Sequence, residues 1–385
     1  MWAGHHEYDG IHELPIILSN RYQASDALSA WAGEFGSRSR IANKLPLLSC
    51  RNPAPEFAMS ARSVTAARVR QMVKRQIPAH WGPSYLPAIK AVRGEAPGTS
   101  RVSQIPSARL QRDLHALSTA ERVAMSLALH HGGVWEMWEQ HMFMLEPTEH
   151  PLSGHPRARG LSLPTTSGTL AIAERLGLFT RHPQVLEETS DATVQDGKTS
   201  VWMPVPWIGD LLLFMSDMHG PYCVSWDVKK STGAHGAPGP SADGRIASRC
   251  QEQKARVRDQ VYLEYMRELA IKVVRVSEEE LPVALVINLK RLALAHAQPI
   301  DLPPQTHGDL VEAFKEVIER GDAPSKVIAA FAQRGVPNSV SKRVLESAIY
   351  DRRIRVDLFE SWSVDFPLPP ERSDPLVQYA SWFAR

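Results

Sequence analysis

The pattern of apolar and polar positions divides the chain into an α/β part followed by a helical part. Residues 117–131 place apolar side chains at helical spacing and end at two glycines, which predicts an amphipathic helix. Residues 134–145 and 271–276 have the composition of strands. Further helices are predicted over residues 169–179, 246–269, 281–296, 307–321, 324–335 and 339–353, and a strand over 354–359.

One stretch predicts a β-hairpin with charged residues inside it, WIGDLLLFMSDMHGPYCVSWDVKK at residues 207–230. Residues 211–215 form an apolar run, and residues 222–228 alternate between two faces, so both are typical of strands. The intervening SDMHGP contains a glycine and a proline and favours a chain reversal. The two strands are therefore expected to pair antiparallel.

Two carboxylates and an ammonium are expected to meet at one end of this hairpin. Asp227 and Lys229 share a face because side chains alternate along a strand, and pairing brings Asp210 near Asp227. Such oxygens suit a hard cation such as Mg²⁺, with Mn²⁺ able to substitute, and the lysine can orient or deprotonate a water or stabilise developing charge. The pattern is that of the PD-(D/E)xK nucleases. The alternative is a surface hairpin whose Asp–Lys pair contributes well under ~1 kcal/mol.

A third carboxylate for such a site has two candidates in the neighbouring helices, Glu121 and Glu174. Ser118 and Glu121 also form the sequence of a capping box, which is a structural explanation for that glutamate. Asp217 lies in the predicted turn and leaves too little room for a complete first strand before Asp227. His235, in the loop STGAHGAPGPSADG, is too isolated to suggest a ligand.

The length and the net charge of the chain limit the class of protein but do not indicate a function. A chain of 385 residues should hold two or more domains, and its formal charge of +2 leaves any nucleic-acid surface to a local patch. One such patch is a predicted helix from Ala61 that carries Arg62, Arg68, Arg70, Lys74 and Arg75, although a solvated helix face explains it better.

Neither a membrane span nor a metal-binding cysteine motif is present in the sequence. The longest apolar runs are too short for a bilayer, and the N-terminus lacks a signal-peptide pattern, so we expect a cytoplasmic protein. The three cysteines are far apart and lack CxxC spacing, which argues against a zinc cluster or a disulfide framework.

The helices after residue 277, followed by the strand-like segment, have the order of a winged helix-turn-helix. The later part of this run could place Ser341, Lys342, Arg343, Arg352 and Arg353 against DNA or a partner protein. A small helical packing domain is the alternative. The aromatic and proline-rich last residues are expected either to dock a partner or to pack on the domain.

The order of these segments resembles TnsA, the endonuclease subunit of heteromeric Tns-type transposases. The likeness runs from about residue 80 to about 350 and includes YLPAIK, GTSRV, LSTAERVAMSLALHHGGVWEMWEQ, LAIAERLGLFTRHP, WIGDLLLF, VSWDVK and EYMRELAIKVVRVSEEELPVALVINLKRL. It implies a PD-(D/E)xK core, a restriction-endonuclease-like mixed sheet flanked by helices, and then a winged-helix-like domain. The expected organisation is an N-terminal extension (1–60), the nuclease domain (61–276), the C-terminal domain (277–358) and a tail (359–385).

The resemblance also implies which residues form the site. Glu121 takes the position of the family's helix glutamate, and with Asp210 and Asp227 it would bind the metal, while Lys229 would assist catalysis. Glu174 falls in a helix that the family does not use for metal, and Gln140 would neighbour the site. The residue before Asp210 is a glycine where the family has proline, a departure expected to matter little because the metal needs only the carboxylate.

The function implied by this resemblance is Mg²⁺-dependent cleavage at the 5′ ends of a transposon, on the strand that is not transferred. The expected partners are the transposon-end DNA, a TnsB-like transposase and a TnsC-like AAA+ ATPase, within a bacterial, nucleoid-associated assembly. Two alternatives stay open: a stand-alone restriction or repair nuclease, and a non-catalytic DNA-binding or assembly module.

Overall fold

The computed structural model describes residues 64–97, 101–190, 198–236 and 249–385, so the predicted N-terminal extension (1–60) lies outside the described residues. The strands are β1 (Ser103–Ser107), β2 (Arg112–Ala116), β3 (Val134–Met142), β4 (Gln184–Ser190), β5 (Lys198–Pro204), β6 (Ile208–Asp217), β7 (Gly220–Lys229) and β8 (Lys272–Ser277). The helices are α2 (Ala66–Gln76), α3 (Thr119–His130), α4 (Gly168–Arg175), α5 (Arg249–Glu268), α6 (Val283–His296), α7 (Pro304–Glu319), α8 (Ser325–Ala332), α9 (Asn338–Tyr350), α10 (Pro375–Gln378) and α11 (Ala380–Phe383).

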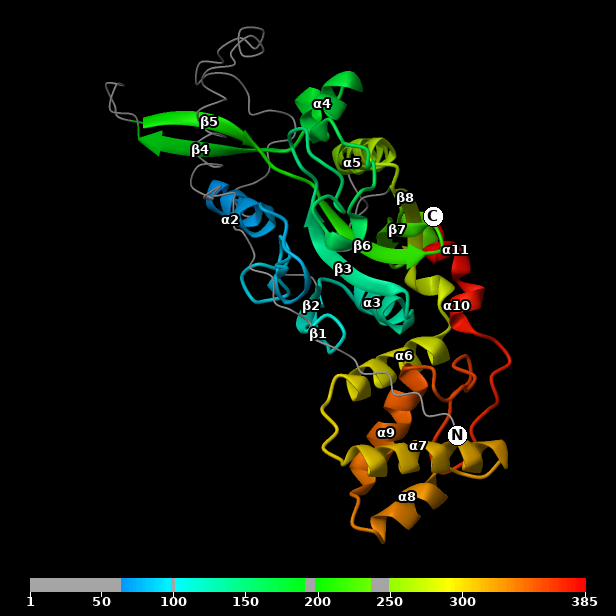
Figure 1. Cartoon of the computed structure of the whole chain (residues 1–385). Helices are drawn as coiled ribbons and strands as arrows, with labels where there is room; N and C mark the ends of the chain where they lie inside the picture. Colours follow the sequence, from blue (N-terminus) through cyan, green and yellow to red (C-terminus); the bar gives the residue numbers. More distant parts are fainter. Residues whose placement is uncertain (1–63, 98–100, 191–197, 237–248) are drawn as a thin grey trace, which may run out of the picture. The chain divides into compact units, whose positions relative to one another are not determined.

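The central element is a mixed four-stranded sheet with the order β3-β6-β7-β8 (Figure 1). Strands β6 and β7 form the predicted antiparallel hairpin, in register from Leu211 opposite Trp226 to Asp217 opposite Gly220. Strand β3 pairs antiparallel with β6, and β8 pairs parallel with β7 after the crossover through α5. The prediction of an α/β protein with a mixed sheet flanked by helices is confirmed.

Helices cover both faces of this sheet because its two central strands are apolar on both sides (Figure 1). Leu211, Val224 and Trp226 pack in one core cluster with α3, whereas Leu212 and Phe214 pack in a second cluster with α4 and α5. The alternation read from residues 222–228 therefore assigns the faces of β7 correctly. The first cluster continues into α6 to α9.

Two hairpins were not predicted from the sequence. Strands β1 and β2 pair over five residues each, and β4 pairs with β5 as a separate two-stranded ribbon (Figure 1). The second ribbon lies in a segment where the sequence predicts no strand, because its polar side chains hide the alternation that identifies a half-buried strand. Tertiary pairing decides such segments more than local composition does.

The four helices α6 to α9 are confirmed, but the strand predicted over residues 354–359 is wrong. This segment forms only an isolated bridge between Val356 and Pro370. Ile354, Val356 and Leu358 are nevertheless buried, so the alternation records packing against the helical core without a partner strand.

The last residues pack on the sheet, as one of the two alternatives for the tail predicted. Trp226 donates its indole N–H to the Trp382 carbonyl at 2.8 Å, and the Tyr222 hydroxyl donates to the Phe383 carbonyl at 2.9 Å. Aromatic contacts join the Trp226 ring to both residues.

Among the described helices, none combines the length and the apolar composition that crossing a bilayer requires.

Candidate active site

Asp210, Asp227 and Lys229 converge on the two central strands, as the hairpin predicted. The Lys229 ammonium lies 2.9 Å from Asp210 Oδ2 and 2.6 Å from Asp227 Oδ1. The Val228 backbone N–H also donates to Asp210 Oδ2, at 2.8 Å. Asp210 is thereby held at the point where β6 approaches the end of β7.

Electrostatic contacts keep this group charged although it is largely buried. Burial would raise the pKa of Asp227, but the charge and hydrogen bond of Lys229 outweigh it and lower that pKa to about 2. Burial would likewise lower the pKa of Lys229, but the negative charges of Asp210 and Asp227 raise it above its ordinary value. The lysine side chain is 23% exposed, so the group is open to solvent on the lysine side.

Glu121 lies at the first turn of α3 and serves both as a cap and as a neighbour of the site. Its Oε2 accepts from the Leu117 backbone N–H at 2.8 Å, and its Oε1 accepts from the Ser118 hydroxyl at 3.0 Å. The Ser118 hydroxyl caps the helix in return by accepting from the Glu121 N–H at 3.1 Å. Burial, reinforced by the negative charge of Asp210, raises the pKa of Glu121 to about 7.

Gln140 connects Glu121 to the sheet, as expected for a neighbour of the site. Its amide donates to Glu121 Oε2 at 2.8 Å. Its backbone has a φ of 49°, in the left-handed region, and lies where the β3–β6 pairing passes from Glu139 opposite Leu211 to His141 opposite Gly209. Such a conformation is uncommon for a residue with a side chain and often marks a functional position.

The two competing carboxylates lie elsewhere. Glu174 is exposed on α4, and none of its described contacts reaches the aspartates or Lys229. Asp217 is exposed as predicted, but it is the last residue of β6 rather than part of the turn, and its carboxylate forms a bidentate pair with Arg385 at 2.7 and 2.8 Å. Only Glu121 of these three acids faces the group formed by Asp210, Asp227 and Lys229.

His235 was set aside as isolated in the sequence, but its side chain contacts the candidate site. The imidazole Nδ1 lies 2.7 Å from Asp227 Oδ2, and Nε2 lies 3.1 Å from the Ser277 hydroxyl. The histidine side chain is only 3% exposed. Because His235 follows β7 closely and β8 runs parallel beside β7, the hairpin and the parallel neighbour together could have suggested this contact.

Arg258 of α5 was also missed. Its guanidinium donates to the Ile208 carbonyl at 2.9 Å and lies 4.0 Å from Asp210 Oδ1. Its side chain remains 39% exposed, which places a cation at the solvent side of the carboxylates. No local motif marks this residue, because it belongs to a helix rich in arginine.

Gly209, which precedes Asp210, is required by its surroundings. A Cβ at this position would overlap the imidazole of His141 and come within 2.8 Å of the Phe143 ring. His141 is itself fully buried, and within the described part of the chain neither of its ring nitrogens has a hydrogen-bond partner. The glycine is therefore explained by packing, whereas the expectation that it matters little for the metal stays a prediction.

The donor atoms fit a hard divalent cation in chemistry, although no preformed ligand cage is present. Across the described ranges, no three His, Cys, Asp or Glu side chains are gathered as metal ligands. Mg²⁺ needs only one or two carboxylates, since waters and phosphate oxygens complete its shell. Glu121 and Asp210 suit this role, because the rise in the pKa of Glu121 comes partly from repulsion by Asp210, which a cation would relieve.

A second cluster of buried charge, the arginine cluster, lies beside β3 and is defined by Arg112, Glu136 and Glu139. The Arg112 guanidinium lies 2.8 Å from Glu139 Oε1 and 3.5 Å from Glu136 Oε1. Glu139 also accepts from the His115 backbone N–H, and Glu136 accepts from the Gly82 N–H at 2.5 Å. Glu139 is fully buried, and burial raises its pKa.

Several of the basic residues predicted to face nucleic acid are used inside the fold. On α2, Arg75 forms a bidentate pair with Glu95 at 2.7 and 2.8 Å, and Arg68 donates to the Gly94 carbonyl. Arg70 pairs with Glu187 of β4. These contacts show that three cations of the helix bind other segments of the fold, which differs from the solvated helix face that was expected, and Arg62 lies outside the described residues.

Of the C-terminal residues that could face DNA or a partner protein, some are used inside the fold and others are exposed. Ser341 is buried, so it cannot contact DNA. Arg343 donates to the Pro299 carbonyl at 2.8 Å, and Arg352 forms a bidentate pair with Asp374 at 2.9 and 2.5 Å. Lys342 and Arg353 are exposed.

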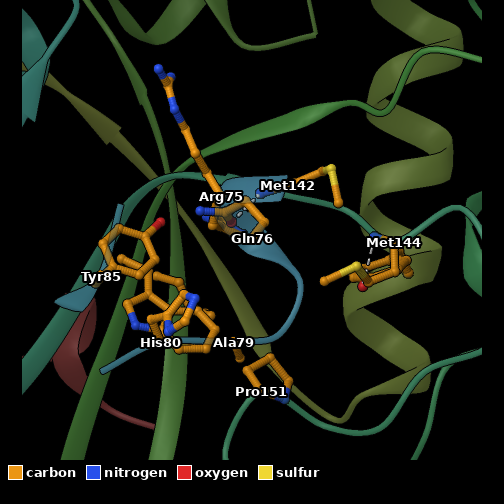
Figure 2. Close-up of a pocket in the computed structure, with 12 residues that line it drawn as sticks. Arg75, Gln76, Ala79, His80, Tyr85, Met142, Met144 and Pro151 are labelled. Atoms are coloured by element: carbon orange, nitrogen blue, oxygen red, sulfur yellow. Dashed lines mark hydrogen bonds between the residues drawn. The ribbon is translucent and has the colours of Figure 1, made fainter. Parts of the chain in front are cut away.

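A small pocket lies beside β3 (Figure 2). Its lining includes Tyr85, Trp138 and His141 but none of the four predicted site residues. The Gln76 amide on its wall donates to the Leu86 carbonyl and accepts from the Met142 N–H at 3.1 Å. This pocket therefore offers no acid or base chemistry related to the candidate site.

No protein-family model matches the chain, and a search among curated proteins gives no match either.

Proposed function

We propose that the chain is a Mg²⁺-dependent DNA endonuclease of the PD-(D/E)xK type. The observation that carries this proposal is the position of Lys229, within 2.9 Å of Asp210 and 2.6 Å of Asp227 on two adjacent strands. Glu121 adds a third carboxylate from α3. The reaction is hydrolysis of a phosphodiester, which suits carboxylates that can hold a hard cation beside a lysine.

In this mechanism each residue has a separate task. Glu121, Asp210 and Asp227 would hold the cation, which lowers the pKa of a bound water and polarises the phosphate. The raised pKa of Lys229 supports the role of an ammonium that orders water and offsets charge on the phosphate, and disfavours the role of a base. Arg258 would contact the phosphate from the solvent side.

The biological setting rests on the resemblance to TnsA. We propose that the cut falls at the 5′ ends of a transposon, together with a TnsB-like transposase and a TnsC-like ATPase. The helices α6 to α9 would then correspond to the helices of the winged-helix-like part, although the segment 354–359 forms no strand of a wing, and Lys342 and Arg353 are among the exposed cations able to meet DNA or a partner. The stand-alone nuclease uses the same site and differs only in needing no partner.

One observation favours the alternative that the chain is a non-catalytic DNA-binding or assembly module. Lys229 already pairs with both aspartates, as it would in a purely structural ion pair. The partial exposure of Lys229 and of Arg258 argues against that explanation, because it leaves the group accessible to a ligand from solvent, which a purely structural group does not need.

The test is Mg²⁺-dependent cleavage of DNA carrying the element's own ends, with and without the neighbouring transposase and ATPase. We expect Asp210→Ala to abolish the 5′-end cuts while the 3′-end cuts persist. Asp217→Ala is the matched control, since this aspartate is exposed on the same strand. Cutting without partners would favour a stand-alone nuclease, and unchanged cleavage by Asp210→Ala would exclude this site.

A further inference from the structure

A line of hydrogen bonds runs from Asp227 to two residues that have no role in the proposed chemistry, His235 and Ser277. Asp227 Oδ2 lies 2.7 Å from His235 Nδ1, and His235 Nε2 lies 3.1 Å from Ser277 Oγ. These are the same atoms, in the same order, as in a Ser-His-Asp triad. Two roles are possible for such a line: a nucleophilic serine, or a support for the aspartate.

A nucleophilic role for Ser277 is excluded by its position. The residue is 1% exposed, at the end of β8 and directly before the 3₁₀ turn Glu278–Glu280. Its backbone N–H is bound by the Glu280 carboxylate at 3.2 Å, which fixes it in that turn. A substrate carbonyl cannot approach a buried hydroxyl, so the line does not act as a hydrolase triad.

The charge of Asp227 fixes the donor and the acceptor of each hydrogen bond in this line. An ionised carboxylate can only accept, so His235 must donate from Nδ1 to Asp227. A neutral imidazole then presents Nε2 as an acceptor, and the Ser277 hydroxyl is its donor. The serine thus fixes the tautomer of the histidine, and the histidine fixes Asp227 Oδ2 while Lys229 binds Oδ1.

The loop that carries His235 is anchored at a second point. Thr232 donates from its backbone N–H and its hydroxyl to Glu279 Oε1, at 2.6 and 2.7 Å. The backbone N–H of Glu279 in turn donates to the Lys230 carbonyl at 3.2 Å. These contacts hold the loop against the end of β8 without touching Asp227.

We propose that His235 is a positioning residue for the cation site. Its imidazole holds the Asp227 carboxylate in place, and the Ser277 hydroxyl holds the imidazole in turn. This inference rests on the proposed nuclease function and adds to it a support that holds the ligand carboxylate in place. Carboxylates that bind metal are themselves commonly held by hydrogen bonds, and losing such a support typically weakens metal affinity by about 10- to 100-fold.

The experiment measures Mn²⁺ binding by the full chain from the loss of the free Mn²⁺ signal in electron paramagnetic resonance, without DNA or turnover. We expect His235→Ala and His235→Phe to weaken Mn²⁺ binding about tenfold or more. His235→Asn should stay close to wild type, because the asparagine amide nitrogen stands the same number of bonds from Cα as Nδ1. Ser277→Ala should weaken binding less than His235→Ala.

Controls separate this inference from the proposed function. Thr232→Ala loosens the same loop without touching Asp227 and should bind Mn²⁺ as wild type does. If Asp210→Ala loses Mn²⁺ while His235→Ala and His235→Phe bind normally, the positioning role is overturned and the nuclease site stands. If Asp210→Ala binds normally, the proposed site itself fails.

Two other results would also overturn the inference. One is a wild-type chain that takes up no Mn²⁺, whatever the cleavage assay shows. The other is a His235→Asn variant as weak as His235→Ala, since the donor to Asp227 would then not be what matters. Thermal melting of each variant identifies any loss that comes from unfolding.

Discussion

Two clusters of buried charge lie beside strand β3, and they differ in composition and in access to water. The arginine cluster joins one guanidinium to Glu136 and Glu139, and its arginine side chain is 6% exposed. The carboxylate cluster, defined by Glu121, Asp210, Asp227 and Lys229, joins three acids to one ammonium, and the side chain of its lysine is 23% exposed. A closed cluster stabilises the fold, whereas an open cluster with excess negative charge can accept a cation.

The comparison also shows how each cluster meets the cost of burying charge. In the arginine cluster, the guanidinium and backbone N–H groups bind both glutamates, but burial still raises the pKa of Glu139, and Glu139 Oε2 has no hydrogen-bond partner among the described residues. In the carboxylate cluster, Glu121 faces Asp210, and part of the cost appears as a pKa of about 7 for Glu121. A group that keeps an unfavourable charge arrangement is a candidate for function more than for stability.

The largest expected effect on stability comes from Arg112→Met. This substitution leaves Glu136 and Glu139 buried without their cation, and breaking such a pair typically costs about 3–5 kcal/mol. Urea denaturation of wild type and variant at pH 7 measures the difference. Lys229→Met, at the more open cluster, should cost clearly less, and equal costs would remove the distinction between the two clusters.

A smaller effect, of opposite sign, is expected for Glu121→Gln. The pKa of Glu121 in the folded chain is about 7, above its ordinary value of 4.5, so stability is lost as the pH rises between these values. The neutral glutamine should therefore stabilise the metal-free protein by roughly 2 kcal/mol at pH 8 and leave it unchanged near pH 4. Its amide can donate to Ser118 while its oxygen accepts from Leu117, so the cap is kept.

The measurement for Glu121→Gln is urea denaturation at a series of pH values, with Glu174→Gln as control. Glu174 is exposed on α4, so its substitution should leave the profile of stability against pH unchanged. A Glu121→Gln difference that is constant from pH 4 to pH 8 would contradict the raised pKa.

The smallest effect is expected for Arg258→Met, which should alter DNA binding without altering stability. Its guanidinium lies at the solvent side of the carboxylate cluster, and loss of one phosphate contact should weaken DNA binding about tenfold. Fluorescence anisotropy with labelled end DNA measures this change. Arg256→Met is the matched control, because Arg256 is exposed on the same helix; equal losses would indicate general electrostatics.

The sequence was sufficient where the signal is local. Alternation along residues 222–228 predicted which face Asp227 shares with Lys229, and the polar turn predicted the hairpin that brings Asp210 close. The capping sequence at Ser118 predicted the start of α3. Each of these features depends on a few neighbouring residues, so no knowledge of the tertiary fold was needed.

What the sequence did not predict depends on contacts between distant segments. His235 meets Ser277 only because β8 returns parallel beside β7, and Arg112 meets Glu139 only because β2 lies against β3. Arg258 differs from the other arginines of α5 by its side of the helix alone. The pairing of β4 with β5 is equally non-local, since a two-stranded ribbon in a polar segment has no apolar face to identify it.

Because the His141 ring packs against Gly209, the residue type at one of these positions limits the residue type at the other. A proline, or any residue with a Cβ, at position 209 would enter the space that the imidazole fills. Relatives with a side chain before the strand aspartate should therefore carry a smaller residue at position 141. The two positions should covary, and Gly209→Ala should cost less stability together with His141→Ala than alone.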